Sequence, residues 1–119
     1  MIVDENLSAK LAVKSGQRII VRRCPDEWHD AFRGLGAAFD RGTIAEVTVS
    51  FVRAQSEIDN ACKEAVALTA PHGVLWMAYP KGGAALVWDS FVHAGWHPAS
   101  EIALDDTWSA VRFSPRGDG

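Results

Sequence analysis

One continuous apolar run constrains the fold of this chain most. In Gly73-Val-Leu-Trp-Met-Ala-Tyr79, every residue after the glycine is apolar. A strand with a single buried face alternates between apolar and polar residues, whereas a continuous apolar run of this length is typical of a strand buried on both faces. Such strands lie in the middle of parallel sheets that helices cover on both sides. The run therefore predicts a central strand, which ends at Pro80-Lys81-Gly82-Gly83.

Four other segments are expected to be strands. Residues 18–22 form a short apolar segment between arginines, and residues 43–52 alternate and are rich in β-branched side chains. Residues 99–104 and 108–113 are separated by too few residues for a crossover helix, so they must pair antiparallel. We therefore expect a mostly parallel sheet of about five strands that finishes in an antiparallel hairpin.

Three helices are expected between these strands. Pro25 and the two acidic residues after it favour a helix start, since proline suits the first position and acids suit the positive end of the helix dipole. Ser56 resembles the N-cap of a second helix, and Pro71 and Gly73 mark its end. A third helical pattern covers residues 84–94.

Length and composition indicate one ordinary domain. The chain has 119 residues, of which 48% are hydrophobic and 23% charged, as in folded soluble proteins. A net charge of -3 argues against nucleic-acid binding, and the apolar runs are too short to span a membrane. We expect a cytoplasmic protein with free thiols, no metal and no cofactor. The expected fold is a three-layer α/β domain over residues 1–113, with a flexible tail at 114–119.

Two patterns resemble the Rossmann-like methyltransferases. Residues 11–21 are similar to the entry of that family into its first strand, and residues 68–75 to its approach to a central strand. Two further motifs, Trp76-Met-Ala-Tyr-Pro-Lys81 and Asp105-Asp-Thr-Trp-Ser109, resemble an uncharacterised bacterial family known only as a domain of unknown function. The resemblance implies a truncated methyltransferase-like sheet and no known activity.

The methyltransferase resemblance also implies features that this chain lacks. That family needs glycines directly after the first strand, where the backbone approaches the methionine part of S-adenosylmethionine. Here the first strand runs into Arg22-Arg-Cys-Pro-Asp26, which has no glycine, and its proline lacks a backbone donor. The acidic residue that would hold the ribose, about twenty positions later, has only Asp40 as a counterpart. We therefore expect a non-catalytic or regulatory module that resembles a degenerate methyltransferase domain.

The alternative is a small enzyme or a binder of an anionic metabolite. Ligands of open parallel sheets bind at the carboxyl ends of the strands. The candidate ligand-binding residues at these ends are Arg53, Lys81, Gly82, Gly83, Asp105 and Thr107. The glycine loop after Lys81 would expose amides that can hold an anion. Charged side chains are also ordinary where strands reach solvent, and Asp105 suits a turn, so no residue is assigned as catalytic.

Two further expectations concern a thiol and a surface. Cys24 follows Arg22 and Arg23 at a helix start, and positive surroundings lower the pKa of a thiol, but we favour a small loop residue because no histidine or aspartate partner can be assigned. Five tryptophans in a short chain, together with the exposed edge of a truncated sheet, predict a homodimer buried through aromatic side chains.

Overall fold

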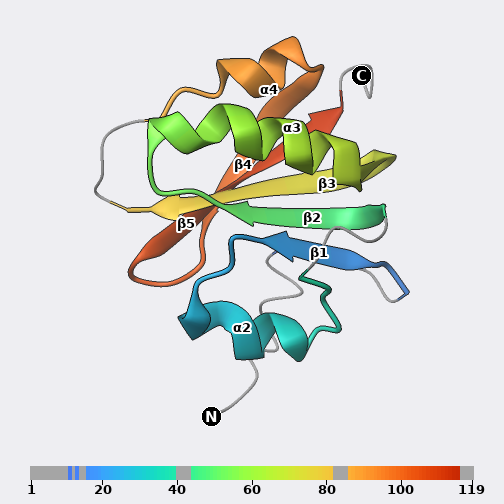
Figure 1. The fold of residues 1–119 in the computed structure, drawn as a ribbon, viewed down its shortest axis with the longest axis vertical. Helices are drawn as coiled ribbons and strands as arrows, with labels where there is room; N and C mark the ends of the chain where they lie inside the picture. Colours follow the sequence, from blue (N-terminus) through green and yellow to red (C-terminus); the bar gives the residue numbers. More distant parts are fainter. Residues whose placement is uncertain (1–10, 12, 14–15, 40–43, 82–85, 116–119) are drawn as a thin grey trace.

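The computed structural model describes residues 11, 13, 16–39, 44–81 and 86–115 (Figure 1). Its strands are β1 (Ile19–Arg22), β2 (Ala45–Phe51), β3 (Thr69–Pro80), β4 (Trp96–Ala103) and β5 (Trp108–Pro115). Its helices are α2 (Asp26–Arg33), α3 (Ile58–Leu68), α4 (Asp89–His93) and the short 3-10 helix η1 (Gln55–Glu57). None of the helices in these residues is long and apolar enough to cross a membrane.

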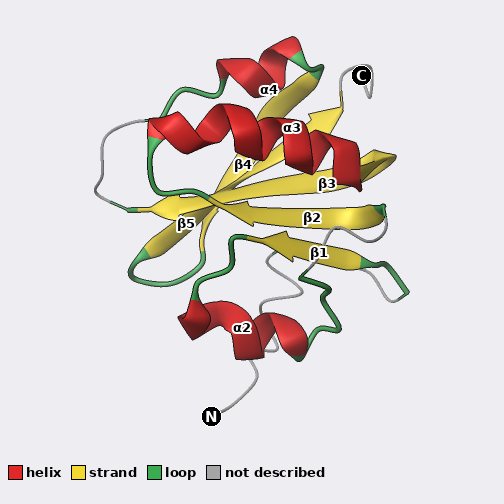
Figure 2. Ribbon diagram, viewed as in Figure 1, coloured by secondary structure: helices red, strands yellow, loops and turns green. Residues whose placement is uncertain are grey.

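The five strands form one sheet in the order β1-β2-β3-β5-β4. The first three are parallel, β5 is antiparallel to β3, and β4 is antiparallel to β5. Helix α2 covers one face of this sheet, and α3 and α4 cover the other (Figure 2). The mixed α/β architecture with a final antiparallel hairpin is therefore confirmed.

The chain changes direction across the sheet between β1 and β2. After α2, Ala38 forms an isolated parallel bridge with Ile20. The Val21 amide donates to the Ala38 carbonyl and the Ala38 amide donates to the Ile19 carbonyl, both at 2.9 Å. One edge of β1 pairs with β2, so the bridge to Ala38 lies on the other edge. After this bridge the chain crosses back past β1 to form β2. Ligands of doubly wound sheets bind at the carboxyl side of such a reversal.

Each face of the sheet has its own buried cluster. The α2 face is built around Phe32 of the helix and Val47, Val49 and Phe51 of β2. On this face, the Trp76 indole N–H also donates to the Leu11 carbonyl at 3.1 Å, which holds Leu11 against the sheet. The α3 and α4 face is built around Ile58, Ala61, Cys62, Ala65, Leu75, Met77, Phe91 and Phe113. Successive side chains of β2 point to opposite faces of the sheet, so Val47, Val49 and Phe51 share the α2 face.

Helix α3 ends and β3 begins without a loop, which differs from the boundary expected at Pro71 and Gly73. At the junction, the Thr69 hydroxyl donates to the Ala65 carbonyl at 2.6 Å and lies 2.8 Å from the Thr48 hydroxyl. The helix-ending role assigned to Gly73 is wrong, because this residue lies inside β3. A Cβ there would stand 2.5 Å from the Glu46 carbonyl oxygen, so glycine permits a close approach of two backbones.

The starts of the second and third helices also differ from expectation. Ser56 is not an N-cap, because it lies inside η1, which precedes α3. The Glu57 carboxylate instead accepts hydrogen bonds from the backbone amides of Arg53 and Ala54, at 2.5 and 3.2 Å. This acidic side chain therefore organises the turn after β2 that the serine was expected to organise.

Helix α4 is shorter than the helix expected over residues 84–94. The Gln55 side chain binds the backbone of Val87 twice, accepting from its amide at 2.8 Å and donating to its carbonyl at 3.0 Å. These bonds hold residue 87 in a non-helical path, and the helix begins only at Asp89. Residues 82–85 lie outside the described part of the chain.

The final hairpin is longer than expected at both ends. Strand β4 starts at Trp96, and β5 continues through Ser114 and Pro115, which were assigned to the tail. Residues 116–119 lie outside the described range. On the outer strand β4, Pro98 lacks a backbone donor, and the register shifts between Pro98 and Ser100. A proline and a bulge are devices that discourage another strand from adding to an edge.

Candidate functional site

The carboxyl ends of β1, β2 and β3 meet at one edge of the sheet, because these strands are parallel. Arg53 follows β2 and Lys81 follows β3 at this edge. The Lys81 amide donates to the Thr107 carbonyl at 2.8 Å, so the loop after β3 is joined to the turn between β4 and β5. Lys81 and Thr107 are thus brought together. Gly82 and Gly83 lie outside the described residues.

Asp105 organises the turn between β4 and β5. Its Oδ1 accepts hydrogen bonds from the Thr107 and Trp108 amides, both at 2.7 Å. This is the geometry in which an aspartate stabilises a turn through nearby backbone donors. One carboxylate oxygen of this candidate residue is therefore used inside the hairpin, where it fixes the start of β5.

The Trp108 side chain closes the α2 face of the same edge. The residue is only 3% exposed, and its ring packs edge-on against Phe51 with centroids 5.1 Å apart. The indole Nε1 donates to the Glu27 carboxylate at 3.2 Å, and the Arg53 guanidinium lies 5.3 Å from the ring centroid. Glu27 and Trp108 are 81 positions apart, so no local sequence signal predicts this contact.

Two arginines at the end of β1 are held by one acidic residue of α3. Glu64 Oε1 lies 3.1 Å from Arg22 Nε and 3.2 Å from Arg23 Nη1. Arg22 also donates to the Phe39 carbonyl at 2.6 Å. Arg23 has a φ of 57°, a left-handed conformation that glycine adopts more readily than other residues. Glu64 thus links both arginines to α3, and Arg22 also contacts the segment after α2.

Cys24 is not an activated thiol. Partial burial, together with the nearby carboxylates of Asp26 and Glu27, raises its pKa to about 11. The arginines expected to lower this pKa instead pair with Glu64. The alternative interpretation, a small loop residue, fits the observed surroundings.

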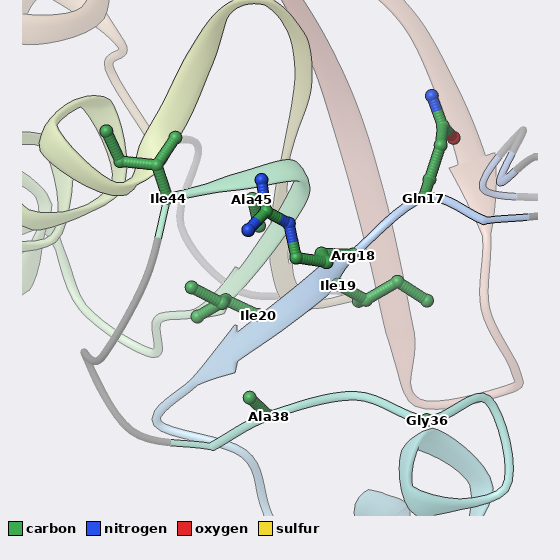
Figure 3. Close-up of a pocket in the computed structure, with 8 residues that line it drawn as sticks. All are labelled: Gln17, Arg18, Ile19, Ile20, Gly36, Ala38, Ile44 and Ala45. Carbon is green, nitrogen blue, oxygen red and sulfur yellow. The ribbon is translucent and has the colours of Figure 1, made fainter.

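Two hollows among the described residues do not include Arg53, Lys81 or Trp108 in their linings. One, of about 210 Å³, is lined by β1, the segment after α2 and the start of β2 (Figure 3). Its lining residues are Gln17, Arg18, Ile19, Ile20, Gly36, Ala38, Ile44 and Ala45. Arg18 is paired there with Glu46 at 3.3 Å, and its backbone amide in particular lowers the pKa of that carboxyl. A second hollow, of about 460 Å³, lies between α3 and α4.

The described residues contain no group of three histidine, cysteine or acidic side chains that could hold a metal ion. The sequence did not indicate three features of the structure. They are the contact between Glu27 and Trp108, the pairing of Glu64 with two arginines, and the two hollows. Each depends on residues far apart in the chain, which only the packing of the elements brings together.

No family model matches the sequence, and no curated protein matches it either. The likeness to an uncharacterised bacterial family therefore depends on its two short motifs alone. Solved structures with a similar fold include the N-methyltransferase NodS from Bradyrhizobium japonicum, at 12% identity and a TM-score of 0.56, covering 93% of each chain.

A TehB-like SAM-dependent methyltransferase from Corynebacterium glutamicum is similar at 11% identity and a TM-score of 0.61, covering 98% of this chain and 89% of that one. A ribosomal protein L11 methylase from Lactobacillus delbrueckii is similar at 6% identity and a TM-score of 0.61, with 92% and 76% covered. At such low identity, these likenesses establish the fold alone. The chain therefore has a Rossmann-like, methyltransferase-like α/β fold.

Proposed function

We propose that this protein is a non-catalytic or regulatory module, in which the methyltransferase-like fold has lost the ability to bind S-adenosylmethionine. Two observations support the proposal together. The solved structures with this fold include SAM-dependent methyltransferases, and the carboxyl edge of this chain is occupied by its own side chains. The domain would then act through its surface, by contacting another molecule, and not through a reaction.

The loop between β1 and α2 does not fit the cofactor. It contains no glycine, and Pro25 removes a backbone donor at the start of the helix. The first turn of α2 carries Asp26 and Glu27, whose negative charges would repel the carboxylate of the methionine part. Arg22 and Arg23, which could balance that charge, are already paired with one glutamate. We therefore derive no chemical step through the cofactor.

The observation that carries the proposal is the position of the Trp108 indole. It lies on the α2 face at the carboxyl ends of the strands, where it contacts Phe51 edge-on, the Arg53 guanidinium lies over its ring, and its N–H donates to Glu27. A ligand at this position would have to displace a nearly completely buried tryptophan and break its hydrogen bond. Reopening such a packed aromatic site costs several kcal/mol, roughly 3–5 when the aromatic side chain is lost altogether.

Isothermal titration calorimetry with S-adenosylmethionine and S-adenosylhomocysteine tests this proposal. A SAM-dependent methyltransferase of the same fold, titrated in parallel, confirms that both ligands are intact. We expect heats of dilution only from this protein. Binding of either ligand with micromolar affinity, or measured methyl transfer to any acceptor, would overturn the proposal.

The alternative function, binding of an anionic metabolite, is supported by one specific observation. Arg53 and Lys81 form no ion pair within the described residues, and Arg53 is held over Trp108 in a fixed position. Two unpaired cations at one edge suit a carboxylate or phosphate ligand.

A thermal-shift screen with phosphate, sugar phosphates and dicarboxylates tests this alternative. A ligand present at a hundred times its dissociation constant would stabilise the fold by about 2.7 kcal/mol. Substituting Arg53→Ala or Lys81→Ala should abolish the shift, whereas Arg33→Ala, on the exposed surface of α2, should leave it unchanged. A shift that survives both edge substitutions excludes this site.

A homodimer stays a prediction. Trp28, Trp76, Trp96 and Trp108 are buried within the protomer, and Trp88 is partly buried, so the aromatic side chains that motivated the dimer mostly have partners already. Sedimentation equilibrium at high micromolar concentration tests it: a dimer mass supports self-association, and a monomer mass excludes it.

A further inference from the structure

The hollow between α3 and α4 has the properties of a small-molecule site. Its volume, about 460 Å³, lies within the range of about 300–1,000 Å³ that is usual for ligand pockets. Small side chains leave this space open, because Val66, Ala67 and Ala94 do not fill the gap between the helices. Cys62 forms part of its lining and is 4% exposed.

The lining around Cys62 includes the apolar side chain of Val66 and one carboxylate, that of Asp59. Burial, and secondarily the Asp59 carboxylate, raise the pKa of the Cys62 thiol to about 11, so the thiol is protonated at neutral pH. The Ser90 hydroxyl donates to the Asp59 carboxylate and ties the beginnings of the two helices together. The acidic group of the hollow therefore already has a partner.

The remaining ionisable residues that line the hollow are basic. Lys63 comes from α3 and His93 from α4, and both are exposed. Neither forms an ion pair within the described residues. An apolar surface next to two basic side chains is complementary to a molecule that has an apolar chain and one negative charge.

We propose that the hollow binds a small amphipathic carboxylic acid, of the class of medium-chain fatty acids. Its alkyl chain lies against Cys62, Val66 and Ala94, and its carboxylate interacts with Lys63 and His93. This site is separate from Arg53 and Lys81 at the carboxyl edge of the sheet, so it does not depend on the function proposed above.

An amide chemical-shift titration with octanoate, octylamine and octanol tests the inference. Octanoate should shift the amides of Cys62, Val66 and Ala94 and bind more tightly than the other two. Lys63→Ala should weaken octanoate binding about fivefold, which corresponds to about 1 kcal/mol for one exposed ion pair. His93→Gln should also weaken it, because it changes the second polar side chain next to the carboxylate. Arg33→Ala, on the opposite face of the sheet, should leave binding unchanged.

A second variant tests the apolar part of the site. Ala67 is exposed, so Ala67→Trp fills the hollow without entering the core. An unchanged thermal melting curve would establish that this variant is folded. We expect it to lose the octanoate shifts. The inference is overturned if Ala67→Trp still binds octanoate, if octylamine or octanol binds at least as tightly, or if no shifts occur around α3 and α4.

Discussion

Replacing Gly73 by alanine probes a close approach of two backbones, those of β2 and β3. A Cβ at this position would lie 2.5 Å from the Glu46 carbonyl oxygen, 3.0 Å from Thr69 Cγ2 and 3.1 Å from the Ala70 carbonyl oxygen. Two of these three atoms belong to the backbone and cannot rotate away. The register of β2 against β3 also shifts here, since Ala45 pairs with Thr69 whereas Val47 pairs with Val74.

The magnitude follows from the movement required. To restore ordinary contact at 3.4 Å, the Glu46 carbonyl must retreat by roughly 0.9 Å from its position at 2.5 Å, which separates β2 from β3 at a buried point. Overpacking of this kind usually costs about 1–3 kcal/mol, and a contact with rigid backbone belongs at the upper end. We therefore expect Gly73→Ala to lower the free energy of unfolding by about 3 kcal/mol.

Urea denaturation followed by circular dichroism measures this change. The matched control is Gly36→Ala, because Gly36 has a φ of 80° but nothing within 4 Å of its virtual Cβ. That substitution should cost only the left-handed backbone conformation, about 1–2 kcal/mol. If Gly73→Ala is as stable as the wild type to within about 0.5 kcal/mol, the close packing of β2 on β3 is refuted.

Three other predictions follow from single contacts. Thr69→Val should lower the free energy of unfolding by about 1–2 kcal/mol in urea denaturation, because it leaves the buried Thr48 hydroxyl without its partner; an unchanged midpoint contradicts this. Glu64→Gln should cost about 1 kcal/mol and make thermal stability less sensitive to salt, since it uncouples the two arginines at the end of β1; equal salt sensitivity in both proteins contradicts the shared ion pair. Folding raises the pKa values of the Cys24 and Cys62 thiols from 9.0 to about 11. Their contribution to the free energy of unfolding is therefore complete below pH 9 and is lost as pH rises toward 11. A Cys24→Ser, Cys62→Ala variant should lose less stability over this interval than the wild type.

The sequence predicts the layers of this fold well, because the layers depend on local patterns. The apolar run at residues 73–79 indicates a strand buried on both faces, and β3 does lie in the middle of the sheet between β2 and β5. The short connection between residues 104 and 108 requires an antiparallel hairpin, and β4 and β5 form one. Alternation in β2 assigns Val47, Val49 and Phe51 to one face, where they pack together.

Boundaries were predicted less well, because long-range contacts decide them. Gln55 binds the backbone of Val87, 32 positions away, and so delays the start of α4. Gly73 resembles a helix terminator in sequence, and only the nearby Glu46 carbonyl reveals its role inside β3. A local pattern contains no information about either contact.

At the carboxyl edge of the sheet, too, the sequence predicts what strand order decides and misses what long-range packing decides. Parallel strands place Arg53 and Lys81 at one edge by topology alone, and the structure joins Lys81 to Thr107 there. The Trp108 indole bound to Glu27 depends on how α2 packs against β5, which no spacing in the sequence encodes. The neighbouring Arg22 and Arg23 suggest a lowered pKa for the Cys24 thiol. In the structure, burial and the carboxylates of Asp26 and Glu27 raise that pKa instead.

The proposed function depends on the chain's own side chains occupying the carboxyl edge of the sheet, where ligands of open α/β sheets bind. The most direct measurement is an amide chemical-shift map of the labelled protein with a large excess of S-adenosylhomocysteine. We expect no shift of the amides from Arg22 to Trp28 or of the indole N–H of Trp108, because these groups lie where the packed Trp108 side chain excludes the ligand. Saturable shifts of these signals, with loss of the hydrogen bond from Trp108 to Glu27, would contradict it.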